Sequence, residues 1–326
     1  MKRKLSIILA VMFCLVMSFV YTAGAVTLLP DPNTVVDGVV VASHYDDFYT
    51  YPASLMIELA QRNPGDPNMT WTEADWFVNT GTGGLDLLIY TGAAGQKNDP
   101  VGGGMSFEDP LIEPNPNHTN SFDGTWGDAD PTNKHSPIAV DGPVYVDDIL
   151  QYLQLNFGTG YTVPVFNFDM TEPQGGKPGE PPNYLTFTGQ VRIVDPDDNS
   201  TVKFWAFDND ENNAFDPNAW VYAPNWLTVS GTSGNYTIRN NVGGGKLDYA
   251  VVAPDMDLSE WSSVTNSGKQ YKFVTDLHFR EIEGGAEEIY LTGKFALPKP
   301  PAIPEPVSAL LIGAGLLGLG FSKKKK

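Results

Sequence analysis

Cysteine is almost absent from this sequence. The single cysteine in 326 residues is Cys14, which lies inside the first apolar run, directly after Phe13. A lipid-accepting cysteine follows small residues at the end of such a run, so Cys14 does not make the chain a lipoprotein. Without that run the chain has no thiol, which excludes disulfides, cysteine-ligated zinc and a cysteine nucleophile.

Basic residues are also scarce outside the two ends of the chain. Residues 26–303 carry 13 Lys and Arg against 38 Asp and Glu, a net charge of −25, whereas the whole sequence carries −19. Such a body repels nucleic acid and anionic lipid head groups. It therefore does not bind an acidic polysaccharide directly, and would need either bridging Ca²⁺ or a neutral glycan.

Short catalytic motifs are missing as well. The sequence has no GxSxG elbow and no P-loop. The densest polar cluster, His-Tyr-Asp-Asp at residues 44–47, contains paired carboxylates, but only their separation in space decides whether such a pair can hydrolyse a glycoside. No catalytic residue is therefore predicted, and a secreted glycan-acting hydrolase is kept as the alternative function.

Histidine is rare too, and the four are His44, His118, His135 and His278. Two of them, His118 and His135, lie near several aspartates, and zinc can use two histidines and a carboxylate. No HExxH or other fixed spacing accompanies them, so we expect solvated loop residues. His278 alternates with apolar neighbours, which predicts an outward-facing position on a strand.

The first 25 residues have the three parts of a secretory signal peptide. Residues 2–4 are basic, residues 5–20 are apolar apart from two serines, and Ala23 and Ala25 place small side chains at the −3 and −1 positions of a cleavage site. We expect cleavage before Val26. The alternative is an uncleaved N-terminal anchor.

A second apolar segment lies towards the other end. Sixteen uncharged residues, 307–322, follow Pro304, Glu305 and Pro306, and four lysines come next, Lys323, Lys324, Lys325 and Lys326. A membrane-spanning helix needs about 20 apolar residues, with roughly 17 as the lower limit, and lysine stems can extend a shorter one. The positive-inside rule keeps the lysines in the cytoplasm, which puts the body outside the inner membrane.

In this order, Pro304-Glu305-Pro306, an apolar Gly/Leu-rich helix and a lysine cluster resemble the PEP-CTERM sorting signal. The resemblance covers residues 304–326 only, and lysine stands where arginine is common in that family. It implies that an exosortase recognises Pro-Glu-Pro, processes the chain and releases it for attachment to the cell surface or extracellular matrix, often beside exopolysaccharide production. The alternative is a plain membrane tail that tethers the protein permanently.

Two-residue alternation dominates the body. In residues 185–193 apolar side chains alternate with Thr, Gln and Arg, and residues 273–279 and 289–295 repeat the pattern. Such runs indicate half-buried β-strands. Shorter strands are expected at residues 35–42, 85–91, 161–168, 202–207, 226–230, 236–238 and 247–252. Many strands between turns predict a mainly β body, an antiparallel β-sandwich with a jelly roll as one form of it.

Two short helices are expected beside the strands. Residues 146–153 place four apolar side chains on one stripe, and Asp147 and Asp148 suit the start of that helix. Residues 54–62 form the second candidate. Two segments lack a clear pattern: residues 92–142, a long Gly- and Asp-rich stretch, and residues 171–183, a Pro- and Gly-rich connection that is a candidate boundary within the body.

The sharpest local pattern is an acidic loop that follows the expected strand at 202–207. Asp208, Asp210, Asn212 and Asp216 occupy relative positions 1, 3, 5 and 9, and alternate residues of a tight turn can converge their oxygens on one Ca²⁺. Position 12 is Ala219 instead of glutamate, so the loop is not an EF-hand. The two interpretations are a calcium site and an ordinary polar hairpin loop.

One of the seven tryptophans stands in a polar stretch. Trp126 is surrounded by Gly and Asp residues, and an exposed aromatic ring can stack on the apolar face of a sugar. Most tryptophans pack in cores instead. Trp126 is therefore the candidate ligand contact, with ordinary packing as the alternative.

These patterns together predict an exported, non-catalytic protein of the cell surface or extracellular matrix. Its parts are a signal peptide (residues 1–25), a β body (26–303) and a sorting signal (304–326). The expected partners are the secretion machinery, an exosortase, the inner membrane for a time, and matrix polysaccharide, while nucleic acid is excluded. Ca²⁺ is the one cofactor for which the sequence offers ligands.

Overall fold

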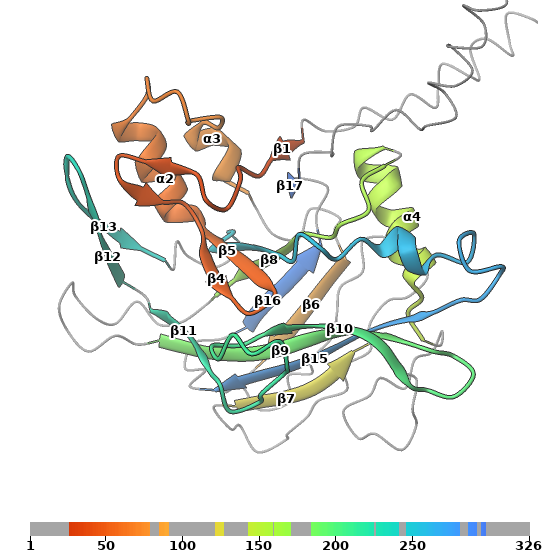
Figure 1. Cartoon of the computed structure of the whole chain (residues 1–326). Helices are drawn as coiled ribbons and strands as arrows, with labels where there is room; N and C mark the ends of the chain where they lie inside the picture. Colours follow the sequence, from red (N-terminus) through yellow and green to blue (C-terminus); the bar gives the residue numbers. More distant parts are fainter. Residues whose placement is uncertain are drawn as a thin grey trace, which may run out of the picture.

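The protein is mainly β in the computed structural model, as the sequence predicts (Figure 1). The structure describes residues 26–78, 85–90, 121–126, 143–158, 160–170, 184–224, 226–240, 246–280, 286–291 and 295–297. Within these residues, several antiparallel sheets are accompanied by three α-helices and one 3₁₀ helix. The predicted signal peptide, the predicted sorting signal and the candidate boundary at 171–183 lie outside them.

The larger sheet combines strands from both halves of the chain. Its described strands, in spatial order, are β4 (Ser43–Tyr45), β5 (Phe48–Pro52), β14 (Tyr249–Val252), β8 (Phe166–Asp169), β16 (Ala286–Leu291) and β6 (Leu85–Tyr90). Every neighbouring pair is antiparallel. The β4–β5 hairpin, which the sequence patterns did not predict, therefore forms one edge of the sheet.

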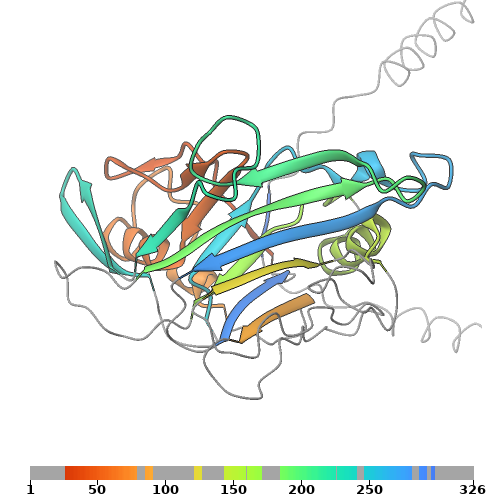
Figure 2. The ribbon, with the colours of Figure 1, turned by 90° about the horizontal axis from the view of Figure 1, so that it is seen from below.

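The second sheet is built around the two longest strands. Its spatial order is β10 (Thr201–Phe207), β9 (Tyr184–Val194), β15 (Lys272–Arg280) and β7 (Ser121–Trp126), and these strands lie side by side in Figure 2. The strand β11 (Val221–Pro224) pairs with β9 beyond the end of β10. β10 and β11 pair with the same edge of β9, and residues 208–220 connect them as a loop at that edge. This segment is called the acidic loop below.

Three shorter pairs complete the β structure. They are β2 (Val35–Val36) with β3 (Val39–Val40), β12 (Trp226–Gly231) with β13 (Gly234–Arg239), and β1 (Thr27–Leu28) with β17 (Phe295–Ala296), the last of these parallel. Asp37 links the first two hairpins, because its carboxylate accepts hydrogen bonds from the Ser233 N–H at 3.0 Å and from the Tyr236 hydroxyl at 2.6 Å. The Ser233 hydroxyl donates to the same carboxylate and contributes most to lowering the pKa of Asp37, followed by the Tyr236 hydroxyl.

Both predicted helices are confirmed. They are α2 (Ala53–Arg62) and α4 (Val146–Phe157); α3 (Glu73–Trp76) and the 3₁₀ helix η1 (Leu258–Trp261) had no clear sequence signal. At the start of α4 the Asp148 carboxylate accepts the Tyr145 N–H at 3.1 Å, and Asp147 accepts the Ser263 N–H at 3.0 Å. Acidic residues thus satisfy backbone donors at the start of α4 and beside it.

Aromatic side chains join the two larger sheets. The Phe168 ring on β8 lies 5.3 Å from the Phe187 ring on β9, and Phe48 on β5 lies 5.6 Å from Phe207 on β10. The buried face of α4 belongs to the same hydrophobic cluster. A second cluster lies under α2 and includes residues of β5, β13 and β14. Most of the apolar surface that drives folding is therefore buried in these two clusters.

Part of the outer face of the second sheet is buried too, more than the prediction of half-buried strands implies. Thr186 and Thr188 on β9 are both buried. The acidic loop folds over this face: the Phe215 ring stacks on His278 at 5.8 Å, and the Arg280 guanidinium lies 4.9 Å from the ring of Trp220. His278 keeps its predicted strand position, but it lies under Phe215 instead of in open solvent.

An ion pair on the same sheet joins β9 to β15. Arg192 donates from Nε to Oδ2 of Asp276 at 2.6 Å and from Nη2 to Oδ1 at 3.0 Å, and the Gln190 amide adds a third donor at 2.8 Å. Both oxygens of the Asp276 carboxylate accept hydrogen bonds. The charged side chains of Arg192 and Asp276 are therefore tolerated although they are mostly buried.

Two predicted strands are broken by turns. The expected strand at 35–42 is a hairpin, because Asp37 and Gly38 adopt positive φ values of 51° and 81°, as a tight primed turn requires. A side chain at Gly38 would place its Cβ 2.5 Å from Oγ1 of Thr232, so the turn needs glycine. The expected run at 289–295 also divides, into β16 of the larger sheet and β17, which pairs with β1.

The 92–142 segment, which had no clear sequence pattern, contains a strand of the second sheet. Residues 121–126 form β7 and pair with β15, so Trp126 lies opposite Thr275. The polar stretch around Trp126 was expected to be a loop, but Trp126 is the last residue of the strand β7, so that expectation is wrong. None of the described helices has the length and the apolar character needed to cross a membrane.

Candidate functional site

The β4–β5 turn is fastened to the edge of the second sheet at the start of the acidic loop. The Asp47 N–H donates to the Ala206 carbonyl at 3.1 Å, and the Ala206 N–H donates to Oδ2 of Asp47 at 2.8 Å. Farther along the loop, the Asn213 N–H donates to Oδ1 of Asp46 at 3.3 Å, across 167 residues of sequence. Two segments that are distant in sequence thus meet at one point.

Three carboxylates converge at this point, and they are called the aspartate cluster below. Asp46, Asp208 and Asp210 each place one carboxylate oxygen within 4.8 Å of the other two. Asp46 and Asp208 are buried, with 6% and 0% of their surface exposed, whereas Asp210 is open to solvent. Among the described residues, no Lys or Arg forms an ion pair with any of the three. Such a cluster can hold a hard cation through oxygen ligands.

The two buried carboxyls of the cluster have raised pKa values. For Asp46 the main cause is burial, followed by repulsion from Asp47 and Asp208. For Asp208 the main cause is also burial, opposed by the backbone N–H donors of Asp216 and Asp210. Burial and like charges both disfavour the ionised form, so folding places negative charge here at a cost.

Hydrogen bonds within the acidic loop separate the four ligands that the sequence predicts. Asp208 accepts the Asp216 N–H on Oδ2 at 2.9 Å and the Asp210 N–H on Oδ1 at 3.2 Å. Asn212 donates its amide to Oδ2 of Asp210 at 2.5 Å, and Asp216 accepts the Asn218 N–H at 2.8 Å. The structure therefore groups Asp208 and Asp210 with Asp46, and not with the carboxylate of Asp216.

Sequence reasoning named Asp46 in a polar cluster but did not connect it with the loop. His44, two residues before Asp46, faces Oε1 of Glu211 at 3.7 Å. The remaining predicted site residues, Ala23, Ala25, His118, His135, Pro304, Glu305, Pro306 and the four lysines, lie outside the described residues. The side chain of Trp126 does too.

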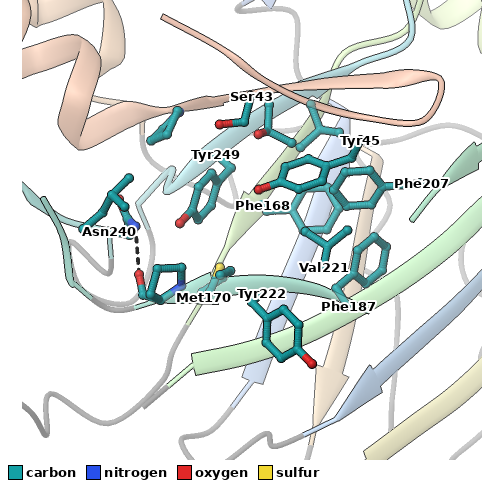
Figure 3. A pocket seen from close by; sticks show the side chains of 16 residues that line it. Ser43, Tyr45, Phe168, Met170, Phe187, Phe207, Val221, Tyr222, Asn240 and Tyr249 are labelled. Carbon is teal, nitrogen blue, oxygen red and sulfur yellow. Dashed lines mark hydrogen bonds between the residues drawn. The ribbon is translucent and has the colours of Figure 1, made fainter. Parts of the chain in front are cut away.

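An aromatic cavity of about 490 Å³ lies beside the aspartate cluster (Figure 3). Tyr45 and Phe207, the residues directly before Asp46 and Asp208, form part of its wall, and their rings are 5.6 Å apart. The remaining aromatic and apolar walls come from both larger sheets, and include Phe168, Phe187, Val221, Tyr249 and Val251. The cavity thus opens within the core between the sheets.

The polar groups of this cavity are neutral. None of its lining residues is acidic or basic, and burial raises the pKa of both the Tyr45 and the Tyr249 hydroxyl. The Asn240 amide donates to the Pro224 carbonyl at 2.8 Å (Figure 3), while its Oδ1 has no hydrogen-bond partner within the residues that the structure describes.

The comparison with protein families gives one match. The family described as a domain of unknown function, DUF8239, matches residues 28–232, which is more than half of the chain. The match includes the β4–β5 turn and the acidic loop. A search of curated proteins and a search of solved structures each returned no match. This chain therefore belongs to the DUF8239 family.

Proposed function

We propose that the chain is an exported, non-catalytic protein of the cell surface or extracellular matrix. The observation that carries the proposal is the order of Pro304-Glu305-Pro306, sixteen uncharged residues and four lysines, in a chain whose first 25 residues have the parts of a signal peptide. In this proposal an exosortase removes the tail after the chain has halted at the inner membrane.

The arrangement of the body suits such processing. The first and last described strands, β1 and β17, pair with each other, with Thr27 opposite Phe295. The first and last described strands therefore lie side by side (Figure 1). Because β17 ends at Ala296, cleavage near Pro304 removes no described strand. The body can fold outside while the tail is still in the membrane, and it stays intact after release.

We further propose that the two larger sheets form an antiparallel β-sandwich. Support comes from the ring contacts between β8 and β9 and between β5 and β10, and from the shared core behind them. The jelly-roll form stays a prediction. A sandwich with an acidic surface suits a soluble surface module, and its charge of −25 favours a neutral glycan, or an acidic one bridged by cations.

Substitution of the sorting motif tests this function. In cells that produce an exosortase, we expect the unchanged chain outside the inner membrane. A variant with Pro304→Ala, Glu305→Ala and Pro306→Ala should accumulate almost entirely in the membrane fraction with Lys326 retained, because the recognised motif is gone. Fractionation followed by immunoblotting with antibodies to the body measures this distribution.

The chain offers a matched control a few residues upstream. Pro298, Lys299 and Pro300 repeat the Pro-charge-Pro pattern outside the motif, and their replacement by alanine should leave release unchanged. Equal release of both triple variants would contradict recognition of Pro-Glu-Pro. Retention of the unchanged chain in the membrane would instead support the permanently tethered alternative.

A further inference from the structure

The aspartate cluster contains a buried oxygen for which the described part of the chain offers no partner. Oδ2 of Asp46 has no hydrogen-bond partner among those residues, although Asp46 is only 6% exposed. Its other oxygen accepts the Asn213 N–H. Burying a polar atom without a partner costs free energy, and burying an unpaired charge costs more. Asp208 and Asp210 each place one carboxylate oxygen within 4.8 Å of an oxygen of Asp46. A cation is the group that all three carboxylates could share.

We propose that Asp46, Asp208 and Asp210 bind a calcium ion that fastens the β4–β5 turn to the acidic loop. The site differs from the loop pattern in the sequence, because one ligand comes from a different sheet and Asp216 is not among the three. The inference is independent of export and sorting. It concerns only the folded body.

The chemistry of the three ligands favours a hard divalent cation. All three are carboxylates, which suit Ca²⁺, Mg²⁺ or Mn²⁺, whereas zinc and copper prefer imidazole and thiolate. Ca²⁺ binds oxygens at roughly 2.3–2.6 Å, so two oxygens on opposite sides of one ion can be about 4.6–5.2 Å apart. The 4.8 Å limit of the cluster falls within that span. The exposed side at Asp210 leaves room for the water ligands that complete six to eight positions.

Binding would add a link between parts of the fold that the Asp47–Ala206 and Asn213–Asp46 hydrogen bonds already join. Asp46 belongs to the turn at the edge of the larger sheet, whereas Asp208 and Asp210 follow β10 of the second sheet. Tyr45 and Phe207 carry the effect inward, because each precedes a ligand and forms part of the cavity wall. We therefore expect calcium to stiffen both the turn and that side of the aromatic cavity.

Titration of the full-length protein with CaCl2 and, separately, MgCl2 tests the site. Isothermal titration calorimetry should detect calcium binding, with magnesium weaker. Asp46→Asn, which keeps the shape of the side chain, should weaken calcium binding about tenfold or more, since one charged ligand is lost. Asp210→Asn, at an exposed position that the core does not need, should weaken it as well.

Asp216→Asn is the matched control on the same loop. Its Oδ1 can still accept the bonds from Asn218, and the proposal expects calcium affinity close to that of the unchanged protein. Circular dichroism of each variant shows whether it folds, and Asp210→Asn decides the question if Asp46→Asn does not. The proposal would be overturned if the unchanged protein bound no calcium. It would also be overturned if Asp210→Asn and a folded Asp46→Asn both kept the calcium affinity of the unchanged protein, or if only Asp216→Asn lost it.

Discussion

Replacing Phe187 by alanine is expected to lower the free energy of unfolding by about 3–5 kcal/mol, as removal of a buried aromatic side chain commonly does. Phe187 is 6% exposed, and its ring lies 4.7 Å from Phe279, 5.0 Å from Phe207 and 5.3 Å from Phe168. The last contact joins the two larger sheets. The variant also enlarges a cavity that Phe187 already lines, so the surrounding side chains cannot easily fill the space.

Urea denaturation followed by tryptophan fluorescence measures this loss. The matched control is Phe77→Ala, because Phe77 is 54% exposed, and we expect a change of less than about 0.5 kcal/mol there. A loss at Phe187 as small as that at Phe77 would contradict a core shared by the two sheets. It would mean that β8 and β9 do not pack through this ring.

Asp46→Asn is expected to have opposite effects on stability with and without calcium. Without divalent cations the variant should be more stable than the unchanged protein by about 1–3 kcal/mol, because it removes one of three charges that repel one another at short distance. In calcium at about 100 times the dissociation constant, the unchanged protein gains about 2.7 kcal/mol, and the variant gains less. The order of the two melting temperatures should therefore reverse.

The advantage of the variant without calcium should disappear in acid. The pKa of Asp46 is raised above its value in the unfolded chain by burial and by the charges of Asp47, Asp208 and Asp210. The pair of His44 and Glu211, which also lies beside the turn, is exposed. The folded protein then holds the proton more tightly than the unfolded chain does. The penalty of charged Asp46 is complete above the folded-state pKa and is lost as the pH falls through that value towards about 3.9.

Thermal unfolding of both proteins between pH 7 and pH 4, in EDTA and in excess calcium, measures this difference. Carboxyls away from the aspartate cluster change both proteins alike and cancel in the comparison, whereas Asp208 loses the repulsion from Asp46 in the variant. A difference in melting temperature that does not change with pH would mean that Asp46 is not ionised in the folded protein at neutral pH. A variant that is less stable under all conditions would contradict the repulsion among the three carboxylates.

The long strands and the helices were predictable because their side chains repeat with the period of the backbone. The alternation covers residues 185–193 of β9 and 273–279 of β15, and α4 shows its apolar stripe and acidic start. The alternation did not reveal that part of the outer face of the second sheet is buried as well. The acidic loop, a segment elsewhere in the sequence, reaches this face through the contacts of Phe215 with His278 and of Trp220 with Arg280. These two residues of β15 lie opposite the buried Thr188 and Thr186.

Other misses have local causes. The dipeptide Asp37-Gly38 is a known hairpin signal, but valines on both sides made residues 35–42 look like one strand. β7 has the sequence SFDGTW, which is too polar and glycine-rich to suggest a strand, and its pairing with β15 gives it that form. In each case the result depends on a turn or a partner strand, and not on average hydrophobicity.

The candidate cation site could be predicted only in part, because one of its three ligands, Asp46, is distant in sequence from the other two. The spacing of Asp208 and Asp210 pointed to an oxygen-rich loop, and both belong to the cluster. Asp46 could not be assigned to it from spacing, since the bond from Asn213 spans 167 residues. Asp216 has the right spacing, but its backbone N–H caps Asp208 while its own carboxylate binds Asn218.

Intact-mass spectrometry of the protein recovered from its native cells tests the proposed function most directly. We expect the chain in the surface or matrix fraction, with Val26 at its start and its other end near Pro304. A chain found in the cytosol with Met1 and Lys326 both in place would contradict export and sorting together.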